Sequence, residues 1–190
     1  MKYLMDNSGI PVNKQLPATL TAGVDIEEYY ILAGIKDDIR NFVESGKNVY
    51  ICSKYTGNGK TSWALKLMLR YFNEIWAGNG FRVRGLFVNV PTLLLQLKNF
   101  NNPLSEEYKR NLLNCDLVIF DDIADVTISN YDYSNLFMII DYRLQNGLSC
   151  IFTSNQTTKD SLEKLLGSRM ASRIWNTSKI VEFNGKDKRN

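Results

Sequence analysis

The sequence contains no histidine among its 190 residues. Histidine supplies the imidazole of Ser-His-Asp triads, the usual proton carrier near neutral pH and a ligand of most zinc sites. The absence of this residue excludes histidine-based acid–base catalysis and disfavours zinc. Any catalysis must therefore rest on carboxylates, lysine, arginine and a bound metal ion.

Cysteine is scarce, and long hydrophobic runs are absent. The cysteines Cys52, Cys115 and Cys150 lie far apart and form no C-x-x-C pair, which indicates buried free thiols in a reducing compartment. No apolar run approaches the roughly 18 residues that span a bilayer, and the first residues lack the apolar segment of a signal peptide. We therefore expect a cytoplasmic protein with no membrane contact.

Charge of either sign is nearly balanced. The chain has 23 Lys and Arg against 20 Asp and Glu, a net charge of +3, so any nucleic-acid contact must come from local clusters. Hydrophobic residues make up 44% of the sequence, as in globular proteins. This length suits one α/β domain with a single core.

Residues 1–24 are polar and are interrupted by Pro11, Pro17 and Gly23, which predicts an extended N-terminal arm rather than a packed element. Residues 25–190 are predicted to form the domain proper. Their apolar spacing predicts strands over Asn48–Ser53, Arg84–Val90, Leu117–Asp121, Leu148–Ser154 and Lys179–Phe183. It predicts helices over Asp25–Val43, Lys60–Trp76, Thr92–Lys98, Glu106–Leu113 and Asp132–Gln145, and a helix or helix pair over Lys159–Trp175. Strands that alternate with helices imply an α/β fold with a five-stranded, mostly parallel sheet.

A glycine-rich segment, Lys54 to Thr61, follows the first predicted strand and opens a helix. It fits the P-loop pattern except that Lys54 stands in place of the first glycine. Gly57 and Gly59 let backbone N–H groups turn toward phosphate, Lys60 reaches the β- and γ-phosphates, and Thr61 ligates Mg²⁺. The predicted nucleotide-binding residues are Thr56, Gly57, Asn58, Gly59, Lys60, Thr61 and Ser62. The alternative is an ordinary glycine-rich turn, which the flanking strand and helix make less favourable.

Two carboxylates, Asp121 and Asp122, end the apolar strand Leu117–Asp121. Ligands gather at the carboxyl ends of parallel strands, so this pair is typical of a Walker B element. Asp121 is the predicted Mg²⁺ ligand together with Thr61, and Asp122 is the predicted base that polarises the attacking water. An aspartate pair that opens a turn remains the alternative.

A neutral amide follows the fourth predicted strand, in Thr153-Ser154-Asn155. It lies at the same edge of the sheet, and Asn155 is therefore predicted to orient the attacking water. Asparagine after a strand is more often a turn residue, so this interpretation depends on the two preceding motifs.

Taken in order, these motifs resemble the AAA+ ATPases of the DnaC/DnaI helicase-loader group, close relatives of the IstB transposition helpers. The resemblance covers residues 25–189 and includes the phrase from Leu86 to Leu94, Asp121-Asp122-Ile123, and Thr153-Ser154-Asn155 as sensor 1. It implies a P-loop NTPase with a three-layer α/β/α fold and no helical lid. Its expected cofactors are ATP and Mg²⁺, and its expected partners are a replicative helicase, single-stranded DNA and further copies of the chain.

The resemblance also implies an arginine finger. Ser172-Arg173-Ile174 is similar to the box that carries it, so Arg173 of one subunit is expected to reach the γ-phosphate held by its neighbour. Arg169 competes for this role, and either side chain can instead be an ordinary helix-surface residue. Gly185 to Arg189 is similar to the group's closing Gly-x-Asp-x-Arg, in which Arg189 is a sensor or part of a basic tail.

Two departures from the group accompany these matches. Lys54 replaces a glycine, and residues 1–24 are too short for the N-terminal helicase-binding domain of typical loaders, so we expect a short form. Phage or mobile-element origin would fit such a form. Single-stranded DNA contact is predicted near Lys98, Phe100, Tyr108, Lys109 and Arg110, where basic and aromatic side chains alternate, although such charges also suit a solvated helix face.

The sequence thus predicts a slow ATPase, stimulated by assembly or DNA, that helps place a replicative hexameric helicase. An IstB-like transposition helper would bind duplex DNA and a transposase instead. A nucleotide-switched scaffold, which binds ATP with little hydrolysis, is favoured by Lys54 and by Asp rather than Glu at position 122. A nucleoside or nucleotide kinase is disfavoured by Asp121-Asp122 and Asn155, and no site for a phosphate acceptor is evident.

Overall fold

The computed structural model describes residues 1–14, 23–78, 80–98, 105–124 and 129–185. Its centre is one five-stranded sheet in the order β2-β3-β4-β1-β5, in which every neighbouring pair is parallel. The strands are β1 (Asn48–Cys52), β2 (Gly85–Asn89), β3 (Leu117–Asp121), β4 (Ser149–Ser154) and β5 (Ser178–Glu182). Parallel strands need crossovers, which the helices between them supply. The predicted five-stranded parallel sheet is confirmed.

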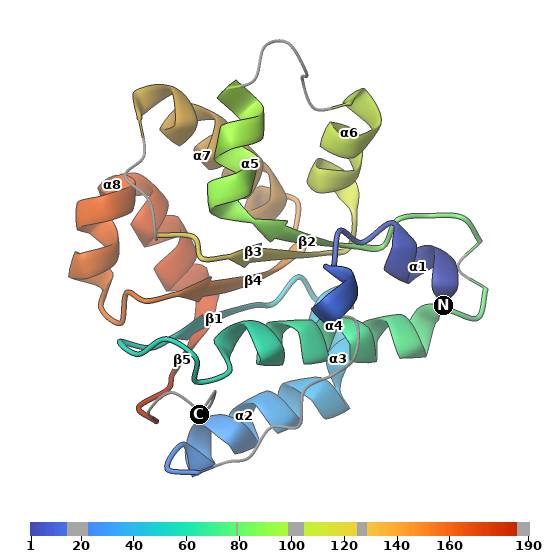
Figure 1. Cartoon of the computed structure of the whole chain (residues 1–190), viewed down its shortest axis with the longest axis horizontal. Helices are drawn as coiled ribbons and strands as arrows, with labels where there is room; N and C mark the ends of the chain where they lie inside the picture. Colours follow the sequence, from blue (N-terminus) through green and yellow to red (C-terminus); the bar gives the residue numbers. More distant parts are fainter. Residues whose placement is uncertain (15–22, 79, 99–104, 125–128, 186–190) are drawn as a thin grey trace.

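Helices cover both faces of the sheet and complete the three predicted layers (Figure 1). One face carries α1 (Lys2–Asp6), α2 (Ile26–Asp37), α3 (Ile39–Glu44) and α4 (Lys60–Ile75). The other face carries α5 (Val90–Lys98), α6 (Glu106–Asn114), α7 (Asn130–Gln145) and α8 (Lys159–Thr177). A short 3₁₀ helix spans Val12–Lys14. The described residues contain no helical lid domain, in line with the sequence-based expectation.

The side chains of the central strands divide between two cores. Val49 and Ile51 of β1 pack with α2 and α4, whereas Tyr50 and Cys52 pack with the helices of the opposite face. This division follows from the period of two along a strand. Because β1, β3 and β4 are buried on both faces, they read as continuous apolar runs in the sequence.

The helix predicted over residues 25–43 is interrupted at Asp38. There the backbone leaves helical geometry, with φ −114° and ψ 34°, so that α2 ends and α3 begins. The Asp38 carboxylate accepts a hydrogen bond of 2.8 Å from Asn41 Nδ2, a contact typical of an aspartate beside a helix start. The predicted helix or helix pair after residue 159 is one element bent at Gly167, whose φ is 72°.

The N-terminal residues differ from their prediction. Residues 2–6 form a helix, and Leu4 and Ile10 are buried in the core beside α4 and β2, so the interpretation of this part as an extended, unpacked arm is wrong. Ser8 accepts a hydrogen bond of 2.7 Å from the Phe87 N–H of the edge strand β2. The segment packs despite its polar composition because it buries two aliphatic side chains and gives the edge strand a hydrogen-bond partner. Residues 15–22 lie outside the described part, and the domain boundary near residue 25 stays a prediction.

Candidate active site

The glycine-rich loop lies between β1 and α4, at the carboxyl edge of the sheet (Figure 1). Gly57 and Gly59 have φ values of 71° and 103°, a region that glycine enters without steric cost. The 16-residue helix α4 begins at Lys60, directly after Gly59. Its free N–H groups and its dipole therefore favour an anion at this point. The strand–loop–helix context predicted for a P-loop is present.

Lys54, which replaces the first glycine of the motif, is exposed and does not have positive φ. Among the described non-glycine residues, only Asp122 does. A lysine adopts negative φ freely, so the loop leaves β1 without backbone strain at Lys54. The departure from the motif therefore concerns the side chain at the entrance of the loop and leaves its backbone path intact.

The side chains of the loop lie at different depths. Lys60 is only 7% exposed, and its Nζ donates a hydrogen bond of 2.9 Å to the Tyr55 carbonyl oxygen, which places the ammonium group over the loop. Thr56 is exposed, and Ser62 in the first turn of α4 is half-buried. Ser53, at the end of β1, accepts from the Tyr55 N–H at 3.1 Å.

Asp121 joins the loop to the next two motifs. Its Oδ1 accepts hydrogen bonds from Thr61 Oγ1 at 2.8 Å and from Thr153 Oγ1 at 2.7 Å. The carboxylate is 2% exposed. Thr61 lies in the first turn of α4 and Thr153 lies on β4, so Asp121 of β3 joins a helix start to the neighbouring strand. The two residues predicted to hold Mg²⁺, Thr61 and Asp121, are thus brought together.

The donor set at this point fits a magnesium ion. Mg²⁺ prefers hard oxygen ligands and is usually bound by one or two protein side chains together with phosphate oxygens and water. Thr61 and Asp121 offer a hydroxyl and a carboxylate oxygen 2.8 Å apart. In the described part of the chain, no cluster of three Asp, Glu, Cys or His side chains forms a self-sufficient metal cage. A metal here would therefore depend on the phosphates of a bound nucleotide.

Asp122 has an unusual backbone, with φ of 56°. A left-handed conformation costs a non-glycine residue roughly 1–2 kcal/mol. Thr153 holds it there: its Oγ1 accepts from the Asp122 N–H at 3.0 Å, and its carbonyl accepts from the Ile123 N–H at 3.0 Å. Thr153 is fully buried. One threonine therefore contacts both predicted Walker B carboxylate residues, a role that the sequence reasoning missed.

Asn155 follows the last residue of β4, which lies between β3 and β1. The register aligns Ser154 with Cys52 of β1, so Asn155 lies level with Ser53, the first residue after that strand. It is half-buried. Three predicted polar strand ends, at Asn155, Asp121 and the loop after β1, therefore share one edge of the sheet.

The two internal arginine candidates lie on α8, away from the loop in sequence and in contact with other groups. Arg173 Nε lies 3.1 Å from Asp141 Oδ1 of α7, at ion-pair distance but without the alignment of a hydrogen bond, and its side chain is 45% exposed. The Arg169 guanidinium lies 4.9 Å from the centroid of the Phe137 ring. Neither contacts the glycine-rich loop of its own chain within the described structure. Arg189 lies outside the described residues.

A chain of hydrogen bonds, which sequence reasoning missed, links the segment before α2 and the segment after β5 to the glycine-rich loop. Asp25, before α2, is 1% exposed, and its Oδ1 accepts from the N–H groups of Asn184 at 2.7 Å and Gly185 at 3.0 Å. The Gly185 carbonyl in turn accepts from Asn58 Nδ2 at 3.5 Å, and the same amide nitrogen donates to Ser53. In the sequence, Asp25 is distinguished only as an acidic residue at a helix start.

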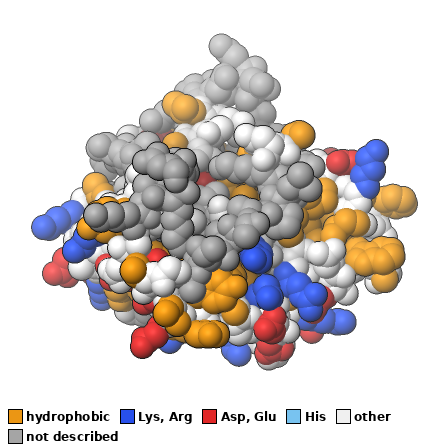
Figure 2. Space-filling model, turned by 60° about the horizontal axis from the view of Figure 1, so that its bottom comes forward, with side chains coloured by type: hydrophobic (Ala, Val, Ile, Leu, Met, Phe, Trp, Pro, Cys, Tyr) orange, Lys and Arg blue, Asp and Glu red, His pale blue; other side chains and the backbone are white. Residues whose placement is uncertain are grey.

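The predicted DNA-contact residues are only partly available for such contact. Tyr108 is half-buried and packs against the core, and Lys109 pairs with Glu106 at 2.7 Å. Arg110 is exposed, whereas Phe100 and the side chain of Lys98 lie outside the described structure. On the face shown in Figure 2, basic and acidic side chains are intermixed along the lower rim. The charge pattern agrees with a net charge of only +3.

The sequence matches the family of IstB-like ATP binding proteins over residues 21–190. A search of curated proteins finds no significant match. In the described residues, no helix has the length and apolar character needed to cross a bilayer.

Several solved structures share the fold. The crystal structure of the DnaC helicase loader matches with a TM-score of 0.74 and 19% identity, over 97% of this chain and 100% of that chain. The crystal structure of DnaI matches with a TM-score of 0.65 and 21% identity, over 95% and 92%. A putative primosome component from Streptococcus pyogenes serotype M3 matches with a TM-score of 0.62 and 21% identity, over 83% and 81%. At these identities the similarity concerns the fold, and it confirms the predicted P-loop, AAA+ type of α/β architecture.

Proposed function

Since this chain belongs to the family of IstB-like ATP-binding proteins, we propose that it is a cytoplasmic ATPase that acts as a helicase loader. It assembles with ATP, binds single-stranded DNA and helps place a replicative hexameric helicase. The observation that carries the ATPase part is the convergence of Thr61 and Thr153 on Asp121, with Asp122 held directly beside it. A merely structural glycine turn has no need of a buried carboxylate shared by two hydroxyls.

In the proposed reaction, the first turn of α4 and Lys60 hold the β- and γ-phosphates of ATP. Thr61 and Asp121 hold Mg²⁺, which neutralises charge on the phosphate oxygens when bound. Asp122 accepts a proton from a water molecule that Asn155 orients, the water oxygen bonds to the γ-phosphorus, and the bond to the β–γ bridging oxygen breaks. The products are ADP and inorganic phosphate.

Arg173 of a neighbouring subunit is proposed to complete the site. Its side chain is 45% exposed and makes no contact with its own glycine-rich loop in the described structure, so it is free to serve a second subunit. Its contact with Asp141 is weak support for a fixed structural role, because exposed ion pairs contribute only about 0–1 kcal/mol. Arg169, which stacks on Phe137, is the second candidate for the role.

The loader role is supported by the extent of the fold similarity. The match to this chain covers 100% of the DnaC helicase loader chain and 92% of the DnaI chain in their crystal structures. The shared fold therefore extends through nearly all of both chains. DnaA bound to AMPPCP and single-stranded DNA has the same fold at 14% identity, with a TM-score of 0.63 over 91% of this chain.

One experiment tests the proposal in stages. The purified chain is incubated with ATP, with and without single-stranded DNA, and phosphate release and particle mass by light scattering are recorded together. ATP-dependent assembly with turnover that rises on DNA addition is the expected result. Assembly and ATP binding without turnover in either condition would instead identify a nucleotide-switched scaffold.

One alternative client is a transposase. An IstB-like transposition helper, the alternative raised by the sequence, would bind duplex DNA and a transposase. Tagged chain loaded with ATP is mixed with a replicative helicase and, separately, with a transposase of the same host or element. Retention of the helicase supports the loader, whereas retention of the transposase alone would refute it.

A further inference from the structure

The two edges of the sheet are treated differently. At the β2 edge, the Phe87 N–H donates to the Ser8 carbonyl, so the N-terminal segment supplies a partner for this strand. At the opposite edge lies β5, and no described residue hydrogen-bonds to its outer side. Free strand edges invite pairing with another chain, and proteins usually cover or charge them.

The direction of the peptide groups of β5 follows from one hydrogen bond. The Phe183 N–H donates to the Cys52 carbonyl of β1 at 2.8 Å. Because N–H and C=O groups point to alternate sides along a strand, those of Ile180 and Glu182 point away from β1. Within the described structure these groups have no protein partner, so they are available to a further strand.

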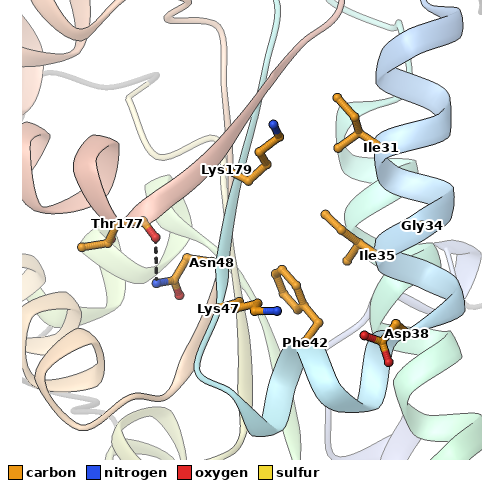
Figure 3. Close-up of a pocket in the computed structure, with 9 residues that line it drawn as sticks. All are labelled: Ile31, Gly34, Ile35, Asp38, Phe42, Lys47, Asn48, Thr177 and Lys179. Carbon is orange, nitrogen blue, oxygen red and sulfur yellow. Dashed lines mark hydrogen bonds between the residues drawn. The ribbon is translucent and has the colours of Figure 1, made fainter.

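A groove of about 420 Å³ adjoins this edge, between β5 and helix α2 (Figure 3). Ile31 and Ile35 project from α2 toward the strands, and Phe42 closes the end of the groove. Lys179 of β5 lies on the same side of the sheet as Val181, because residues two positions apart in a strand share a face. The groove therefore lies where alternate side chains of an added strand would point.

Gly34 in α2 leaves part of the groove wall bare. Apart from the adjoining residues and backbone of its own helix, no atom lies within 4 Å of the position that a Cβ would occupy, and its φ is not positive. Glycine within a helix costs about 0.5–1 kcal/mol relative to alanine, and here neither packing nor backbone geometry requires it. A bare helix surface lets a second backbone or a bulky side chain approach closely, which gives this glycine a reason.

The polar residues of the groove favour an acidic occupant. Lys47 and Lys179 are exposed and have no carboxylate partner among the described residues. Asp38 is the one acidic residue among those that line the groove, and its carboxylate already accepts from Asn41. Two unpaired cations beside an apolar wall match a segment that carries both carboxylates and aliphatic side chains.

We propose that this groove and the outer edge of β5 bind an extended acidic segment of a partner protein, which joins the sheet as a sixth strand. The main chain of the segment pairs with Ile180 and Glu182, its apolar side chains lie over Gly34 between Ile31 and Ile35, and its carboxylates meet Lys47 and Lys179. Strand addition of this kind obtains affinity from the backbone and specificity from alternate side chains. The site is separate from the nucleotide residues and does not depend on ATP hydrolysis.

A displayed library of random peptides of about ten residues, enough to span β5, tests the proposal on the full chain. Selected peptides are then synthesised with a fluorophore and titrated by anisotropy. We expect aliphatic and acidic residues at every second position, because the side chains that face the groove are two residues apart. Gly34→Leu and Lys179→Glu should each weaken binding about tenfold or more, which corresponds to about 1.4 kcal/mol. Lys164→Glu, the same charge change on α8, is the matched control and should leave binding within about twofold.

Two further measurements decide the binding mode and the class of ligand. Amide hydrogen exchange at Ile180 and Glu182 should slow when the peptide binds, whereas Gly34→Leu should keep normal thermal stability and ATP binding. Failure to select any acidic and aliphatic peptide, or binding that is indifferent to both groove variants, would overturn the proposal. So would unchanged exchange at Ile180. Single-stranded DNA binding that Lys179→Glu abolishes, without peptide selection, would reassign the lysines to nucleic acid.

Discussion

Replacing Thr153 by valine removes a buried hydroxyl that two residues share. Oγ1 donates to Asp121 and accepts from the Asp122 N–H, and valine has nearly the same shape without either function. A buried donor left unpaired costs about 1–3 kcal/mol, and a hydrogen bond to a charged group contributes about 1.5–3 kcal/mol. We therefore expect the free energy of unfolding, measured by urea denaturation, to fall by about 2–4 kcal/mol.

The same substitution should affect turnover more than nucleotide binding. Without the Thr153 hydroxyl, the Asp122 N–H loses its 3.0 Å hydrogen bond, and we expect the residue to relax away from a conformation that costs roughly 1–2 kcal/mol. A displacement of about 1 Å can reduce a rate about 100-fold, so kcat should fall by about 10- to 100-fold. The Kd for ATP should stay within about threefold, because Lys60 and the loop are unchanged.

Two variants separate positioning from packing. Thr153→Ser keeps the hydroxyl and loses one methyl group, worth about 1 kcal/mol, so it should retain most of kcat. In an Asp122→Gly background, glycine adopts φ 56° without strain, so no strain is released there and the valine substitution should cost about 1 kcal/mol more stability than in wild type. If serine were as inactive as valine, or if valine kept wild-type kcat, the proposed role of Thr153 would be wrong.

The remaining predictions concern the site, its assembly and the buried thiols. Lys60→Ala should abolish ATP binding in an equilibrium titration, whereas Asp122→Asn should keep binding and stop phosphate release; unchanged turnover in the second variant would remove Asp122 as the base. Arg173→Ala should stop turnover without weakening ATP binding. Mixing this variant with Lys60→Ala should restore part of the activity, and no restoration at any mixing ratio would show that the sites are not shared. Burial raises the pKa of the Cys52 thiol from 9.0 to about 12 and that of Cys115 to about 11. The unfolded state therefore binds fewer protons above pH 9, and urea denaturation should show stability falling between about pH 9 and 12, less steeply when both cysteines are replaced by alanine.

The central sheet could be predicted because its strands are buried on both faces. A continuous apolar run such as Leu117–Asp121 indicates a strand that is covered on both faces of the sheet. The glycine-rich loop and the paired aspartates mark the carboxyl ends of two such strands. Local sequence is sufficient to predict these elements because the apolar runs, the glycine-rich loop and the polar strand ends all indicate the same strand and helix boundaries. The order of the strands, which brings Thr61 and Asp121 within 2.8 Å, is a tertiary property that no single segment encodes.

The elements that were missed depend on contacts between distant segments. Leu4 and Ile10 are isolated apolar residues in a polar stretch, and only the β2 edge and the core beside it make a packed helix favourable. Asp38 ends α2 through its non-helical backbone angles, which helical periodicity does not predict. Thr153 is an ordinary strand residue by composition, and its importance arises because Asp121 and Asp122 lie on the neighbouring strand.

The Asp25 carboxylate holds two distant parts of the described chain together. Its Oδ1 lies 3.0 Å from the Gly185 nitrogen, so the chain between these residues forms a nearly closed ring around the sheet. A circular permutant that joins position 185 to position 25 through a short flexible linker would lose little conformational entropy on closure. New ends opened at an exposed position such as Gly78 would then be free for attachment of a probe.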